Sequence, residues 1–227
     1  MTITDIGEQK LHIFWQRVVE GGSTQVEGAV FNLDLEQLSS PLKILNADDM
    51  ETKLPDSVLI HGNQTVVIAI SESAGKWSIT GRTLCGEEWV TPPYTIQAES
   101  DSEILGTDVS EILPGILTVC WASESKLLCS IFTESGEILE SEILINDSFD
   151  FVGISYNWIV DFNDGTFVVV WKVIPASDTN SENMILLQKM NMKGGRMWGL
   201  CNNRLCDENE SCESCPKDCG TCLNDSV

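Results

Sequence analysis

Four copies of a short apolar run recur along the chain at a nearly constant spacing. They read "KLHIFWQRV", "TVVIAISES", "ILTVCWASES" and "TFVVVWKVI", and each leads to a tryptophan or its counterpart. Trp15, Ala69, Trp121 and Trp171 hold the same place in the four copies, at spacings of 54, 52 and 50 residues. Self-similarity at a fixed period is typical of folds that stack one structural unit beside the next.

Each copy is accompanied by further strand-like segments. A second segment follows each run, as in "VEGAVFNL" and "KLLCSIFTE", and the first three copies close on a third, "PLKILN", "PPYTIQ" and "SEILIND". Between copies lie segments such as "DSVLIHGN" and "ISYNWIVDF". Four short strands per unit of about 50 residues, without an amphipathic helix, are typical of propeller blades. We predict an all-β fold of four propeller-like blades over residues 1–199.

Two hairpins can be read residue by residue. In "TVCWASESKLLCS" a tight turn at "ES" places Cys120 opposite Cys129 in a non-hydrogen-bonded pair, where side chains approach most closely. This register predicts a disulfide, with two buried thiols as the alternative. In "WIVDFNDGTFVVVW" a two-residue "DG" turn of type I′ predicts that Trp158 lies opposite Trp171.

The last segment, residues 200–227, differs in composition from the rest. Six cysteines fall in the pattern C-x4-C-x5-C-x2-C-x3-C-x2-C, and few large apolar residues accompany them. A segment without a hydrophobic core is held by covalent staples or stays unfolded, so we expect disulfides. Zinc is the rival interpretation, but the two CxxC units lie only three residues apart, too close for a zinc ribbon. The six cysteines are Cys201, Cys206, Cys212, Cys215, Cys219 and Cys222.

Both parts of the chain resemble known secreted modules. The segment "IAISESAGKWSITGRTLCGEEWVTPPYTIQ" and the run "DGTFVVVW" resemble sialidase-like β-propeller repeats of secreted prokaryotic proteins. The tail is similar to a six-cysteine module of the C-x5-C-x2-C-P-x-D-C-G-x-C type. These resemblances imply a propeller fold and an extracellular or cell-surface location. They carry over no catalytic residue, because no arginine cluster and no tyrosine–glutamate pair of a sialidase can be recognised.

Several smaller signals remain open. Asn63, Asn146 and Asn224 each begin an N-x-S/T acceptor pattern for glycosylation. The tail carboxylates Asp207, Glu208, Glu210 and Asp218 could hold calcium, which prefers oxygen ligands, or could be solvated surface charges. No other cofactor is indicated. Cys85, the ninth cysteine, is either a buried thiol or a bridge to another subunit.

The charge balance excludes one class of partner. The net charge is −22, with 35 acidic against 13 basic residues, whereas nucleic-acid binding needs clustered lysine and arginine. No apolar run approaches the ~20 residues of a membrane span. The favoured function is therefore a non-catalytic structural or binding module outside the cell, with glycans or cell-surface molecules as partners. The alternatives are a filament subunit whose incomplete end blades are completed by neighbours, and a glycan-acting enzyme of sialidase-like fold.

Overall fold

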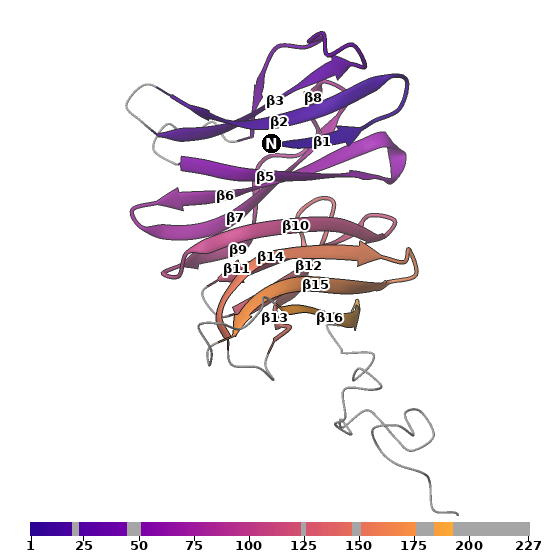
Figure 1. Ribbon diagram of the computed structural model, residues 1–227. Coiled ribbons are helices and arrows are strands. Elements are labelled where there is room, and N and C mark those ends of the chain that lie inside the picture. The colour runs from indigo at the N-terminus through magenta and orange to yellow at the C-terminus, as the bar shows by residue number, and fades with distance from the viewer. Residues whose placement is uncertain (20–22, 45–50, 124–125, 147–150, 176–183, 193–227) are drawn as a thin grey trace, which may run out of the picture.

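The computed structural model describes residues 1–19, 23–44, 51–123, 126–146, 151–175 and 184–192. These residues are almost entirely in β-strands, with one 3₁₀ turn at His61–Asn63. The strands form four separate antiparallel sheets that follow one another along the chain. Figure 1 shows the sheets as successive blades of an arc, with the first and the last at its two ends. The predicted all-β, four-blade architecture is confirmed.

The first two blades contain nine strands. In blade 1 the order is β1 (Thr2–Asp5), β2 (Lys10–Val18), β3 (Thr24–Asn32) and β4 (Leu42–Lys43). In blade 2 the path is β5 (Glu51–Ile60), β6 (Gln64–Ser73), β7 (Lys76–Cys85) and β8 (Glu88–Trp89), and β9 (Tyr94–Ser100) also pairs with β7.

The last two blades contain seven strands. Blade 3 orders β10 (Ile104–Leu113), β11 (Ile116–Ser123), β12 (Lys126–Thr133) and β13 (Ile138–Leu144). Blade 4 orders β14 (Phe151–Asp161), β15 (Thr166–Pro175) and β16 (Met184–Asn191). The Cys-rich segment 200–227 lies outside the described residues, so its expected disulfides and the boundary at residue 199 stay predictions.

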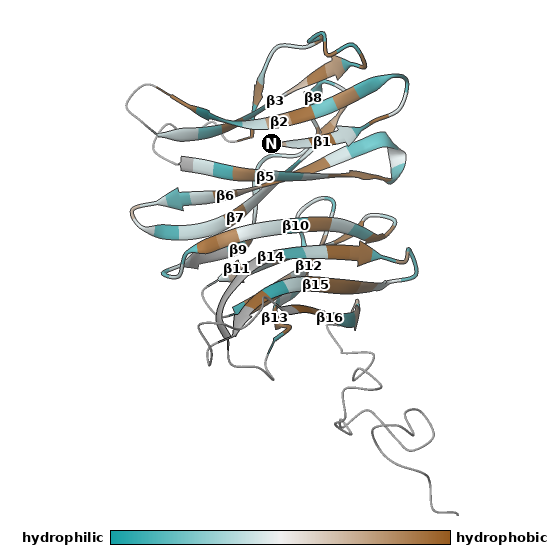
Figure 2. Cartoon of the chain, in the orientation of Figure 1, coloured by the Kyte–Doolittle hydropathy of each residue, from teal (hydrophilic) through white to brown (hydrophobic). Residues whose placement is uncertain are grey.

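The second strand of each blade carries the repeated apolar run, and its two faces pack on different neighbours. Leu117, Val119 and Trp121 on β11 belong to a buried cluster shared with blade 2. Cys120 and Ala122, the alternate residues of the same strand, pack with blade 4. Because successive side chains of a strand point to opposite faces, a strand buried on both sides must be apolar throughout. This explains the continuous apolar runs in the sequence and the brown stretches of β2 and β15 in Figure 2.

Three apolar clusters therefore fill the three blade-to-blade interfaces. Phe14 anchors the cluster between blades 1 and 2, and Trp121 anchors the one between blades 2 and 3. Phe167 and Trp171 anchor the cluster between blades 3 and 4. All four side chains are nearly inaccessible to solvent. Blade 4 packs on blade 3, and blade 2 packs on blade 1. No comparable packing joins blade 4 to blade 1 among the residues that the structure describes. As far as the described strands extend, the arc is therefore open at both ends.

One predicted register is confirmed and the other is wrong. In the β11–β12 hairpin Ser123 pairs with Lys126 and Cys120 with Cys129, as the sequence predicts. In the β14–β15 hairpin Trp158 lies opposite Val170 rather than Trp171. The turn is longer than two residues, since Phe162 N donates to Thr166 O across residues 163–165.

The longer turn has a local cause. Asn163 and Gly165 adopt positive φ angles of 56° and 81°, and the Asp164 carboxylate accepts hydrogen bonds from both the N–H and the hydroxyl of Thr166. A one-residue shift of register moves a side chain to the opposite face of the sheet. Trp171 is thereby buried, whereas Trp158 is 50% exposed.

Candidate functional site

A pocket of about 360 Å³ lies where the first strands of all four blades meet. We call it the axial pocket. Its walls come from β1, β5, β10 and β14 and from Met1, which precedes β1. The lining residues are Met1, Thr2, Leu54, Pro55, Asp56, Leu105, Gly106, Thr107, Asp108, Asn157 and Trp158.

Two aspartates form the polar centre of this pocket. Asp56 lies opposite Ile68 in blade 2, and Asp108 lies opposite Cys120 in blade 3. They are 52 residues apart and therefore hold the same position of the repeat. Thr2 in blade 1 and Trp158 in blade 4 hold that position in the other blades.

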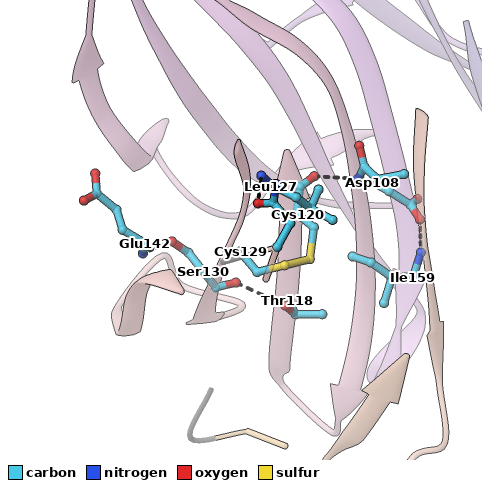
Figure 3. The surroundings of a disulfide bond; sticks show 10 residues. Asp108, Thr118, Cys120, Leu127, Cys129, Ser130, Glu142 and Ile159 are labelled. Atoms are coloured by element: carbon cyan, nitrogen blue, oxygen red, sulfur yellow. Dashed lines mark hydrogen bonds between the residues drawn. A yellow bond between two sulfur atoms is a disulfide. The ribbon is translucent and has the colours of Figure 1, made fainter. Parts of the chain in front are cut away.

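Each of these aspartates also holds the next blade in place. The Asp56 carboxylate accepts a hydrogen bond from Val109 N of blade 3 at 3.0 Å. Asp108 in turn accepts one from Ile159 N of blade 4 (Figure 3). In blade 1 the hydroxyl of Thr2 lies 3.1 Å from that of Ser57. A polar side chain of one inner strand thus reaches the next inner strand at each of the three interfaces.

The carboxyl groups of Asp56 and Asp108 influence each other's ionisation. Burial, followed by the nearby charge of Asp108, raises the pKa of Asp56 to about 7, since both effects disfavour the charged form. Burial likewise raises the pKa of Asp108. The Asp56 carboxyl group is therefore protonated up to near neutral pH.

Two other side chains give the pocket its remaining character. Trp158 presents a half-exposed indole at the position that is an aspartate in blades 2 and 3. The hydroxyl oxygen of Thr107 is buried and makes no hydrogen bond within the described part of the chain. Buried hydroxyls nearly always have a partner, and where the protein supplies none a bound water or ligand can do so. An aromatic ring beside carboxyl and hydroxyl groups suits a ligand with apolar and hydroxylated faces.

The predicted cross-strand disulfide lies close to this pocket. Cys120 and Cys129 are joined, with their Cα atoms 4.0 Å apart, and both are fully buried. Figure 3 shows the bond beside Asp108 and Ile159, where blade 3 meets blade 4. Asn157, which lines the pocket, donates its side-chain N–H to Cys120 O at 3.0 Å. Cys85 is exposed rather than buried, contrary to the first of the two expectations for it.

The glycosylation signals differ in accessibility. Asn63 is exposed at the turn between β5 and β6. Asn146 is 5% exposed and its side-chain oxygen accepts a hydrogen bond from Leu127 N. In the folded protein the Asn146 side chain is therefore buried and already hydrogen-bonded. Asn224 lies outside the described residues, as do the four tail carboxylates considered for calcium.

The two histidines bridge blades. His12 is buried, with its ring nitrogens 2.8 Å from Thr65 Oγ1 and from Gly86 O of blade 2. Burial lowers its pKa, so the neutral ring is favoured. His61, half exposed, lies 2.9 Å from a carboxylate oxygen of Glu111 in blade 3, and this hydrogen bond raises its pKa. Neither histidine lines the axial pocket.

The axial site was not predicted from the sequence, although one signal for it existed. Aligning "LPDSVLI" with "GTDVSEI" by the repeat places Asp56 on Asp108. The described residues contain no cluster of three or more histidine, cysteine or acidic side chains arranged to hold a metal. They also contain no helix that could cross a membrane.

No protein-family model and no curated protein sequence matches this chain. Solved structures do. A thermostable family-43 glycoside hydrolase matches with a TM-score of 0.54 and 12% identity over 83% of this chain and 70% of that one. The α-L-arabinofuranosidase PaAbf62A from Podospora anserina, solved with cellotriose, matches with 0.52 and 11% over 89% of this chain and 66% of that one.

A third similar structure, a protein of unknown function from Dyadobacter fermentans, has a TM-score of 0.59 and 9% identity over 82% of this chain and 51% of that one. The chain thus spans between half and seven tenths of the length of these three proteins. At such low identity the similarity shows the fold alone. The class is that of propeller-like all-β proteins.

Proposed function

We propose that this chain is a non-catalytic glycan-binding propeller that works outside the cell, with its ligand in the axial pocket. The observation that carries this proposal is the buried pair of aspartates in the axial pocket, because Asp56 and Asp108 each accept a hydrogen bond from a backbone N–H of the next blade and burial raises both of their pKa values. These are the two acidic residues that line the pocket.

Their surroundings argue against hydrolysis. Most glycosidases use one carboxyl group as a proton donor and a second, ionised one as nucleophile or base. Burial raises the pKa of both Asp56 and Asp108, which disfavours the ionised group that this chemistry needs. Both aspartates also accept a hydrogen bond from a backbone N–H of the next blade. Their positions therefore depend on how the blades pack. A glycan-acting enzyme remains the competing function because several similar structures are glycoside hydrolases.

The remaining lining suits a sugar. A sugar ring offers hydroxyls that donate to and accept from carboxyl groups, and a C–H face that packs on an indole. The Thr107 hydroxyl, buried without a partner among the described residues, adds one further group for a ligand to satisfy. The extracellular location is supported by the Cys120–Cys129 disulfide, since such bonds persist in oxidising compartments.

Calorimetric titration with cellotriose tests the proposal, because one similar protein was solved with this sugar. We expect saturable binding that Trp158→Ala weakens at least tenfold. Phe162→Ala is the matched control, because Phe162 follows the same strand, is equally exposed and lies outside the pocket lining. Binding should survive in that control.

Three results would count against the proposal. Absence of binding to cellotriose and to a wider glycan array would remove it. Equal losses in the two variants would move the ligand away from the axial pocket. Release of reducing sugar during the titration, abolished by Asp108→Asn, would establish the enzyme instead.

A further inference from the structure

Blade 4 ends the arc with an apolar sheet face. Strand register places Trp158, Val170 and Leu187 side by side on this face, with Val160 and Ile185 along the same strands. Ile185 is 71% exposed, Val160 51% and Leu187 43%. Contiguous exposed apolar patches of this kind mark interaction sites.

The repeat shows what covers this face elsewhere in the molecule. Val170 and Leu187 form a cross-strand pair in blade 4, at the positions where Cys120 and Cys129 pair in blade 3. In blade 3 that pair is fully buried against the Phe167 and Trp171 side of the following blade. The end face of blade 4 is thus built like a face that receives the tryptophan side of another blade.

Blade 1 presents that tryptophan side at the other end of the arc. Leu11, Trp15 and Phe31 hold the positions of Leu117, Trp121 and Phe132, as the pairing of Leu11 with Phe31 and of Leu117 with Phe132 shows. Leu117, Trp121 and Phe132 are buried against blade 2. Their counterparts in blade 1 are only partly buried, and Ile3 beside them is 52% exposed. The molecule therefore carries both halves of its own blade-to-blade interface.

Charge favours the same pairing. Lys172 and Lys189 stand on the open face of blade 4, and Asp164 of the β14–β15 turn lies near enough to Lys189 to interact with its charge. The molecule as a whole carries a net charge of −22. On the tryptophan side of blade 1, Asp5 is exposed at the edge. A second copy, with its excess of negative charge, is thus attracted to a face that carries two lysines.

We propose that the open face of blade 4 binds the tryptophan side of blade 1 in a second copy of this chain. The contact joins two different surfaces, so it is heterologous, and repetition gives either a closed ring or an open filament. This assembly does not rest on the glycan-binding function proposed above, although Trp158 belongs both to this face and to the lining of the axial pocket.

Two variants that each block one end test the proposal. Ile185→Asp places a charge on the blade 4 face, and Ile3→Asp places one on the blade 1 face. Val90→Asp is the control, because Val90 is 51% exposed on blade 2 and belongs to neither face. Multi-angle light scattering of the purified full chain at high micromolar concentration gives the mass of each species. Circular dichroism checks that each variant is folded, and Leu187→Asp replaces Ile185→Asp if it is not.

We expect the wild type and the Val90→Asp control to be larger than the 25.0 kDa single chain. Each end-blocked variant alone should be a single chain, and an equimolar mixture of the two should give a species of twice that mass, because each supplies the face that the other lacks. A monomeric wild type would overturn the proposal. So would a mixture that stays monomeric, or an end-blocked variant that still pairs with itself, since a symmetric dimer needs only one of the faces.

Discussion

The interface between blades 1 and 2 and the interface between blades 3 and 4 are built from the same repeat positions with different side chains. In the first, Phe14 packs on Val67 and Ala69 of blade 2, and the repeat's tryptophan is absent. In the second, Trp171 and Phe167 pack on the buried Cys120–Cys129 disulfide. Both interfaces are filled, so apolar groups of different shape can exchange as long as the total volume is kept.

The polar contacts of the two interfaces are less interchangeable. Blades 1 and 2 are joined by the neutral His12 and by threonine and serine hydroxyls. Blades 3 and 4 are joined by the carboxylate of Asp108. The same register position is Thr2, Asp56, Asp108 and Trp158 in the four blades, and it is this variation that gives the axial pocket its chemistry. Apolar repeat positions therefore maintain the fold, whereas the inner polar position distinguishes the blades.

The largest effect is expected where one repeat position differs in burial. Trp171→Ala should lower the free energy of unfolding by about 3–5 kcal/mol, because it empties a fully buried site. Trp15→Ala, at the same position in blade 1, should cost much less because this side chain is partly exposed. Urea denaturation of dilute protein measures both. Equal losses would mean that the blade 1 face is covered in solution even at low concentration.

A somewhat smaller effect is expected from the disulfide, which only one of the two interfaces contains. Replacing both Cys120 and Cys129 by serine should cost about 2–4 kcal/mol, since the unfolded chain gains freedom and two hydroxyls enter an apolar cluster. Cys85→Ser is the control, and its exposed site predicts almost no change. Thermal unfolding under non-reducing conditions gives the comparison. A loss confined to blade 4 in hydrogen exchange would show that the blades unfold separately.

The smallest effect concerns pH, and its sign should differ between the axial pocket, which contains Asp56, and the interface of blades 1 and 2, which contains His12. The raised pKa of Asp56, about 7 against 3.8 in the unfolded chain, favours the protonated folded form. Its contribution is fully present below pH 4 and is lost as the pH rises through 7. The lowered pKa of His12 favours the neutral form, so its contribution is present above pH 6.5 and is lost as the pH falls below it.

Melting temperatures between pH 4 and pH 8 measure the sum of these two contributions, and variants separate them. Asp56→Asn should flatten the stability loss between pH 4 and 7, whereas His12→Gln should flatten the loss below pH 6.5. An unchanged pH profile in Asp56→Asn would refute the raised pKa of Asp56. These two substitutions lie at different interfaces, so their effects should add.

The sequence was sufficient to predict the blades because their cause is local and repeated. A run buried on both faces must be apolar throughout, and four such runs at near-constant spacing leave few folds other than a blade array. The β11–β12 register was also predictable, since a two-residue turn fixes every pair that follows it. The β14–β15 register was not, because Asn163 takes a positive φ and the Asp164 side chain bonds Thr166, which lengthens the turn.

By itself, then, the sequence determined the all-β repeat, its four blades and the partners of the Cys120–Cys129 pair. Only the tertiary structure decided that Asp56 and Asp108 line one pocket with raised pKa values and that Trp158 lines that pocket while Trp171 is buried. The physical reason is distance. Strand pairing within a hairpin is set by neighbours along the chain, whereas the pocket forms where strands about 50 residues apart are brought together by packing between blades.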